Sequence, residues 1–263
     1  MGDISYEPLI RDMTWSYSRV KAFDDCPYRW YLKYIRYPHA DGKRLFFSDY
    51  GKFMHELLES YYKGGRTPDD LLYIYLTEFR QRVNPPAPGK KVFENYFTDG
   101  ADCLRGLRQP EQTVLAVEEK VEFSIKDTPF VAYIDLVTED AGGSISLTDN
   151  KSRALKPRSG RGKPTKADDE LDEYLKQLYL YSAAVKKKYG RLPDKLCFNC
   201  FRTGTLIEEP FGNEAYNAAL SWFLRRIEDI AAEQDFTPDI EYFKCRYLCG
   251  MQDRCEYYGL LRR

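Results

Sequence analysis

Three features of other common protein classes are missing from this sequence. It has no phosphate-binding loop of the G-x-x-x-x-G-K-[ST] form, which argues against an intrinsic ATP motor. It has no apolar run of about twenty residues, and its first residues lack the basic and then apolar order of a signal peptide. We therefore expect a cytoplasmic protein with no membrane partner.

The net charge is small and histidine is rare. The formal net charge is −1, so a nucleic-acid-binding surface would have to come from a local concentration of Lys and Arg. Histidine occurs only twice in the chain. Hydrophobic residues make up 43% of the sequence, with 22 Tyr and 15 Phe, which is enough for a packed core and argues against global disorder.

Cysteine, in contrast, occurs seven times. In a cytoplasmic protein, cysteines are more naturally metal ligands or buried thiols than disulfides. Cys245, Cys249 and Cys255 form a compact set, and Cys26, which precedes a proline, is the expected fourth ligand. Four thiolates can bind a [4Fe–4S] cluster or zinc, and the residues alone leave both open.

The other three cysteines are interpreted as packing residues. Cys197 and Cys200 have the C-x-x-C spacing of half a zinc site. The segment around them reads as a strand, however, and side chains three apart on a strand point to opposite faces. Cys103 lies in an expected helix, where we predict a buried thiol.

Hydrophobic periodicity and turn residues predict the order of the elements. Helices are expected after the N-cap Ser16 with a break near Pro27, and then over residues 47–63, from 68 onwards, and over 92–108. Strands at 113–125, 129–137 and 144–151 precede a basic loop at 151–167, and a helix at 168–188, strands at 195–201 and near 206, and a helix at 213–232 follow. This order predicts an α/β fold with a mixed central sheet flanked by helices. We expect one domain over 1–263, with a mainly helical part at 14–110, a core at 111–233, and a cysteine-rich tail at 237–263 that joins Cys26.

Asp149 and Lys151 are the first candidate catalytic residues. They stand two apart at the end of an expected strand, so both side chains should face one site. Phosphodiester hydrolysis uses such a pair, because the carboxylate binds a divalent metal and the ammonium orients the attacking water and neutralises charge. Asp135, between apolar residues in the preceding strand, is a candidate second ligand. Each residue alone has an ordinary structural explanation, since D-x-K is a common tripeptide.

His55, Gln177 and Tyr181 are the other candidates. His55 lies in the middle of an expected helix, where it is either a hydrogen-bonded core residue or a ligand for manganese or magnesium. Gln177 and Tyr181 are four apart on the helix after the basic loop and therefore share a face. They are either packing residues or groups that hold a DNA phosphate and the attacking water.

Taken in order, these motifs resemble the RecB-like branch of the PD-(D/E)xK nucleases from about residue 16 to 255. The matching residues are Gly51 and His55, Ile134 and Asp135, Asp149 and Lys151, Gln177 and Tyr181, and an opening segment Ser16-Tyr17-Ser18-Arg19-Val20-x-x-Phe23-x-x-Cys26-Pro27-Tyr28. The chain departs from the family at Ala132, where glycine is usual, and at Asn150, where tyrosine is common.

This resemblance implies a PD-(D/E)xK restriction-endonuclease-like core with added helices and a cysteine-rich tail. It implies that Mn²⁺ or Mg²⁺ is held by His55, Asp135, Asp149 and the carbonyl of Asn150, with Lys151 activating water and Gln177 and Tyr181 engaging the substrate. Glu118 or Glu119 would assist from nearby. The cysteines resemble those of the AddB and CRISPR-associated exonucleases, which implies a [4Fe–4S] cluster on Cys26, Cys245, Cys249 and Cys255, although the first gap of the triplet has one extra residue.

The sequence thus predicts a metal-dependent DNA exonuclease acting on single strands or DNA ends. A non-catalytic DNA-end-binding or scaffolding subunit of the same fold is the alternative. Residues 151–167 carry seven Lys or Arg and no acid beside the expected site, and we predict that this loop contacts DNA. Tyr28, Trp30 and Tyr31 either stack on bases or belong to the core. Self-association, or partner proteins of CRISPR or recombination pathways, is also expected.

Overall fold

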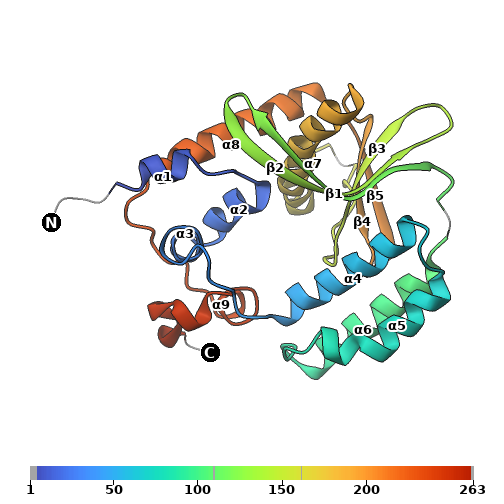
Figure 1. Ribbon diagram of the computed structural model, residues 1–263, viewed down its shortest axis with the longest axis horizontal. Coiled ribbons are helices and arrows are strands. Elements are labelled where there is room, and N and C mark those ends of the chain that lie inside the picture. The colour runs from blue at the N-terminus through green and yellow to red at the C-terminus, as the bar shows by residue number, and fades with distance from the viewer. Residues whose placement is uncertain (1–4, 109, 161, 262–263) are drawn as a thin grey trace.

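The computed structural model describes residues 5–108, 110–160 and 162–261, and a five-stranded sheet lies at the centre of this part of the chain (Figure 1). Its strands are β1 (Thr113–Ile125), β2 (Thr128–Glu139), β3 (Ile145–Asn150), β4 (Lys195–Cys200) and β5 (Thr205–Pro210), and they pair in this order. β3 and β4 are parallel and the other pairs are antiparallel. The prediction of an α/β fold with a mixed sheet is confirmed.

Two long helices, α7 (Lys166–Tyr189) and α8 (Asn213–Ala232), pack with the sheet to form the main hydrophobic core. A capping box between Thr165 and Asp168 begins α7, and Gly190, with a φ of 75°, ends it in the left-handed conformation. The short helix α1 (Glu7–Arg11) and α2 (Tyr17–Asp25) contact α8. Among the helices described, none has the length and apolar character needed to span a membrane.

Three helices form a separate arm with its own core. They are α4 (Phe46–Tyr62), α5 (Pro68–Arg82) and α6 (Lys90–Gly106), and Figure 1 shows them side by side. Their core is rich in aromatic residues and includes Tyr50, Tyr75 and Phe79. α4 also contacts β1, so one helix of the arm reaches the sheet. The residues expected to form one helical part, 14–110, therefore contribute to more than one hydrophobic core.

The two ends of the chain meet in a third, small core. α3 (Pro27–Tyr31) and a π-helical turn η1 (Leu32–Arg36) lie beside α9 (Tyr242–Tyr247) and the 3-10 turns η2 (Gln252–Arg254) and η3 (Glu256–Leu260) (Figure 1). The helix break expected near Pro27 is present, because Cys26 is extended and Pro27 is the first residue of α3. Tyr28, Leu32 and Met251 form the centre of this core.

The N-terminal aromatic residues belong to the protein interior. Tyr28 and Trp30 are buried, and Trp30 stacks on Phe236 with a centroid distance of 5.9 Å. Tyr31 is half-buried and lies 5.1 Å from the same ring. Of the two explanations that the sequence left open for these residues, packing is the one that the structure supports.

Glycine substitutions provide a test of the arm's packing. A Cβ at Gly100 in α6 would lie 2.3 Å from the Oη atom of Tyr75, which is fully buried and cannot move away. Gly100→Ala is therefore expected to lower the free energy of unfolding by about 1–3 kcal/mol. A Cβ added at Gly51 in α4 would meet no other atom within 4 Å, so Gly51→Ala should raise the free energy of unfolding by about 0.5–1 kcal/mol. Urea unfolding of both variants measures these changes, and equal stabilities of the two variants would contradict the close packing of Gly100 against Tyr75.

Candidate active site

Adjacent strands bring Asp135 and Asp149 together. Leu136 of β2 pairs with Thr148 of β3, and this register places the two aspartates opposite each other. Both are buried, with 8% and 5% of their surfaces exposed. Asp135 Oδ2 accepts a hydrogen bond of 2.6 Å from the backbone N–H of Asn150, which follows Asp149 directly. The structure thus joins two of the acids that the sequence predicted as ligands.

Lys151 and Gln177 complete a triangle with Asp149. The Lys151 ammonium lies 2.7 Å from Asp149 Oδ2, just beyond the end of β3. Gln177, on α7, donates to Asp149 Oδ1 at 2.6 Å and accepts from Lys151 Nζ at 2.9 Å. One turn further along α7, Tyr181 is buried, and burial raises the pKa of its phenol while a hydrogen bond with Gln177 lowers it. Tyr181 therefore lies next to Gln177 on the same face of α7.

His55 reaches the same place from the helical arm. Its Nδ1 atom lies 2.9 Å from Glu118 Oε1 and 3.7 Å from Asp135 Oδ2. Its Nε2 atom lies 3.1 Å from the carbonyl oxygen of Asn150. The side chain is 30% exposed, so His55 is not a core histidine. Potential ligand atoms of His55, Glu118 and Asp135 all lie within 4.8 Å of one another.

Glu118, rather than Glu119, is the glutamate of this site. The sequence did not decide which of the two lies at the site. In the structure Glu118 bonds His55, whereas Glu119 forms an ion pair with Lys188. Glu118 has a φ of 46°, in the left-handed region that residues other than glycine rarely adopt. Such strain is concentrated at functional sites. No sequence pattern indicates that Glu118 is the one that faces His55, because this depends on the backbone conformation of a single residue.

Acidic groups and His55 are crowded together in this site. Burial and the neighbouring Asp149 carboxylate raise the pKa of Asp135. Burial lowers the pKa of His55, but the hydrogen bond with Glu118 and the nearby Asp135 outweigh it, and the net shift of the pKa is upward. Asp149 Oδ2 is buried, and its partner among the described residues is the Lys151 ammonium, which forms an ion pair with it.

The donor set is one that a divalent cation would match. It consists of carboxylate oxygens, one backbone carbonyl and one imidazole, without a thiolate, which are the ligand types of Mn²⁺ and Mg²⁺ sites. A cation would also relieve the repulsion between the buried carboxylates of Asp135 and Asp149. The residues present therefore fit the metal that the resemblance implied.

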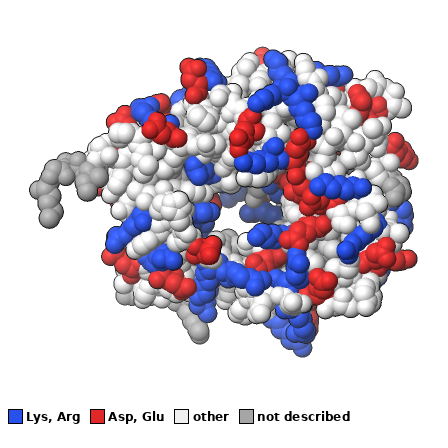
Figure 2. All heavy atoms as spheres, viewed as in Figure 1, with Lys and Arg blue, Asp and Glu red and all other residues white. Residues whose placement is uncertain are grey.

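Part of the basic loop is neutralised by acids of the protein itself. Arg153 forms an ion pair with Glu170 of α7, and Arg158 pairs with Asp172 of α7 and Glu209 of β5. Arg161 lies outside the described residues. The loop therefore has less free positive charge than its sequence indicates. Figure 2 also shows a hollow near the middle of the face in view, with Lys and Arg side chains around it and Asp and Glu side chains beside them.

The four cysteines expected as ligands gather at one place. Cys26, Cys245, Cys249 and Cys255 line the same small cavity between α3 and the tail. Cys26 Sγ accepts backbone N–H bonds from Arg29 and Asp239, each at 3.4 Å. Burial raises the pKa of Cys249 and Cys255, whereas backbone N–H groups that point at these sulphurs lower it. Such donors favour the thiolate form that binds a metal.

The remaining cysteines lie elsewhere. Cys200 faces the main core and Cys197 faces the opposite side of β4, as expected for residues three apart on a strand. Both are buried, and Cys103 is half-buried against the core of the arm. All three are packing residues in the structure.

The mixed sheet brings two aspartates and a lysine together beside the end of β3, a set of groups chemically suited to metal-dependent phosphodiester hydrolysis. The chain belongs to the PD-(D/E)XK nuclease superfamily, whose family model matches residues 14–256. Its fold is similar to that of a candidate exonuclease from Eubacterium rectale, with a TM-score of 0.50 and 14% sequence identity over 100% of this chain and 92% of the other. At that identity the similarity shows the fold alone. No curated protein sequence matches the chain.

Proposed function

We propose that this protein is a Mn²⁺- or Mg²⁺-dependent DNA exonuclease that acts on single strands or DNA ends. The observation that carries the proposal is one continuous polar array. His55, Glu118 and Asp135 form its metal-ligand side, and Asp149, Lys151 and Gln177 form its catalytic side. The two sides meet beside the end of β3, where Asp149 lies opposite Asp135 in the middle of β2.

The metal would be held by His55, Asp135, Asp149 and the carbonyl of Asn150, with Glu118 beside them. When bound, it would supply a nucleophilic hydroxide at neutral pH and neutralise charge on the scissile phosphate. Lys151, held by Gln177, would orient the attacking water and stabilise the charge that develops on the phosphate. Tyr181 would keep the Gln177 amide directed at the site.

Two observations support a single-stranded or terminal substrate. The hollow in Figure 2 lies, by its place in Figure 1, among α2, α4 and the sheet, next to the strands that carry the site. Lys and Arg on its walls would attract the phosphates of a strand. The relative from Eubacterium rectale is described as a candidate exonuclease, which agrees with this assignment.

A [4Fe–4S] cluster on Cys26, Cys245, Cys249 and Cys255 is the second part of the proposal. The four cysteines line one cavity and offer four thiolates, the ligand set of such a cluster. Zinc, which four thiolates can also bind, is the alternative. We propose that the cluster has a structural role.

Cleavage assays with labelled DNA test the proposal. Purified protein with Mn²⁺ or Mg²⁺ should shorten single-stranded DNA from an end, and EDTA should abolish cleavage until metal is added again. Blunt duplex and circular single strands are the matched substrates, because an exonuclease cannot digest a circle. DNA binding without cleavage under every metal condition would instead support the alternative of a non-catalytic DNA-end-binding subunit, which the complete residue set argues against.

A further inference from the structure

The proposed metal site spans two hydrophobic cores, and this raises the question of what holds them in register. His55 belongs to α4 of the arm, whereas Asp149 and Lys151 belong to β3 of the sheet and the residue that follows it. A shift between the cores would separate the ligands of one metal ion. The turn that follows β4 connects the two, because Phe201 packs in the core of the arm although it adjoins the sheet.

Arg202, the next residue of this turn, makes three kinds of contact across the junction. Its Nε and Nη2 atoms donate to Asp99 Oδ2 of α6 at 3.1 and 2.7 Å. Its Nη1 atom donates to the carbonyl of Ser152 at 3.3 Å, one residue after Lys151. Its guanidinium also lies 3.5 Å from the centre of the Tyr96 ring of α6. Arg202 therefore links the chain beside the catalytic lysine to the arm.

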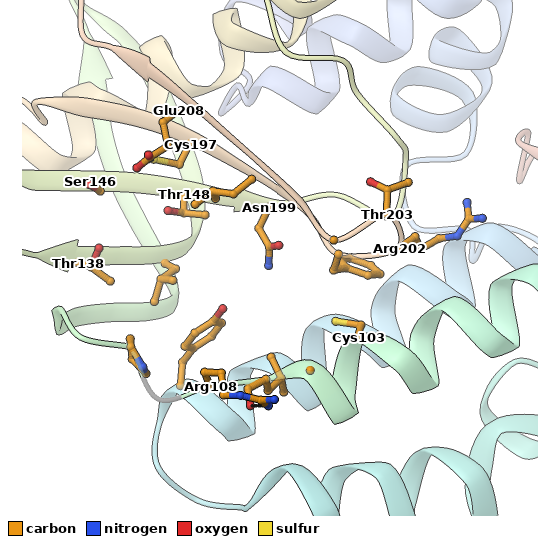
Figure 3. Close-up of a pocket in the computed structure, with 18 of the residues that line it drawn as sticks. Cys103, Arg108, Thr138, Ser146, Thr148, Cys197, Asn199, Arg202, Thr203 and Glu208 are labelled. Atoms are coloured by element: carbon orange, nitrogen blue, oxygen red, sulfur yellow. Dashed lines mark hydrogen bonds between the residues drawn. The ribbon is translucent and has the colours of Figure 1, made fainter.

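Asn199 acts on the same segment from the end of β4. Its side-chain amide donates to Asn150 Oδ1 at 2.8 Å, and its carbonyl accepts from the Lys151 N–H at 2.8 Å. Asn199 and Arg202 both line a cavity of about 620 Å³ between the sheet and α6. Figure 3 shows Asn199 pointing into this cavity and Arg202 at its edge, beside the helices.

We infer that Arg202, fixed by Asp99, is a positioning residue that holds residues 150–152 against the arm and thereby sets the metal affinity of the site. This inference rests on the proposed function of the site. Its geometry requires arginine, because a planar guanidinium can bond a carboxylate, bond a carbonyl and stack on a ring at once. A lysine has one ammonium and cannot make all three contacts.

Metal binding without DNA is the deciding measurement. Titration calorimetry with Mn²⁺ should show an affinity about 10–100-fold lower for Arg202→Ala, the range seen when residues that support metal ligands are removed. Arg202→Lys should be weakened to an intermediate extent, and Asp99→Asn, a change of almost no volume, should weaken binding in the same direction. The double variant Asp99→Asn/Arg202→Ala should resemble Arg202→Ala, because both changes break one linkage.

Arg108→Ala is the matched control. Arg108 lines the same cavity but donates to the carbonyls of Arg105 and Leu107 at the end of its own helix. It should bind Mn²⁺ like the parent protein. In cleavage assays, Arg202→Ala should lower kcat and leave the KM for DNA unchanged, since Arg202 faces the protein. Asp99→Asn is expected to fold normally, because the Asp99 side chain is 32% exposed, so weaker Mn²⁺ binding in this variant would not be caused by misfolding.

The outcomes separate this inference from the proposed function. Parent-like Mn²⁺ affinity in both Arg202→Lys and Asp99→Asn, in a protein that cleaves DNA, would overturn the positioning role alone. If the parent protein binds Mn²⁺ but cleaves no DNA, the nuclease activity is refuted. If the variants then bind Mn²⁺ more weakly than this parent, the positioning role of Arg202 is still supported.

Discussion

Asp149→Asn and Lys151→Ala are each expected to lower the rate of DNA cleavage by at least about 100-fold, the loss typical when one preorganised group at the reacting phosphate is removed. Asp149→Asn removes the charge that binds the cation and pairs with Lys151. Lys151→Ala removes the ammonium that Gln177 holds. Single-turnover rates at saturating Mn²⁺ measure the chemical step directly.

Both variants should still fold, bind DNA and retain their cluster, because the cysteines belong to a different core. Lys156→Ala is the control, since it removes a cation from the same basic stretch without touching the Asp149–Lys151–Gln177 triangle. Its cleavage rate at saturating DNA should be unchanged. Full activity in either site variant would refute the assignment of the catalytic centre.

Cys249→Ser is expected to release the cluster and cause the largest loss of stability. The proposed cluster would join Cys26 to the three tail cysteines, which follow it by more than two hundred residues. A crosslink that closes a loop of this length stabilises a protein by roughly 5 kcal/mol in the chain-entropy model. That is comparable to the whole stability of many domains, which is about 5–15 kcal/mol. Denaturant unfolding should therefore show a much lower midpoint, with the tail unfolding first.

Visible absorption, iron and sulphide content identify the bound group. The parent protein should be brown with broad visible absorption that bleaches on oxidation, and Cys249→Ser should be colourless. Cys103→Ser is the matched control, because this thiol is half-buried in α6 and lies outside the four-cysteine set. A colourless parent protein with stoichiometric zinc would show that the four cysteines bind zinc and not an iron–sulphur cluster. Unchanged stability of Cys249→Ser would show that the bound group has no structural role.

Much of the fold could be predicted because its signals are local. The alternating pattern of 113–125 and the periodic pattern of 213–232 predicted β1 and α8 with their observed ends. At the start of α5, Thr67 is the N-cap and Pro68 is the first helical residue, and both act only on the first turn of this helix. The order of the four weak motifs also predicted the family, since their spacing reflects the order of the elements that carry them.

Other features depended on contacts between distant segments. Glu118 and Glu119 look equivalent in the sequence, and only the left-handed backbone at Glu118 decides which of them faces His55. The charge of the basic loop is reduced by acids of α7 and β5, which no local pattern indicates.

The sequence by itself therefore determined the strands, the long helices and their order, but it did not indicate the short helices α1 and α9. Only the tertiary structure decided which carboxylates meet His55, that Gln177 bonds both Asp149 and Lys151, and that Arg202 contacts both the arm and the residue after Lys151. The physical reason is that caps and periodicity act within a few residues, whereas the geometry of this site depends on how the arm packs against the sheet.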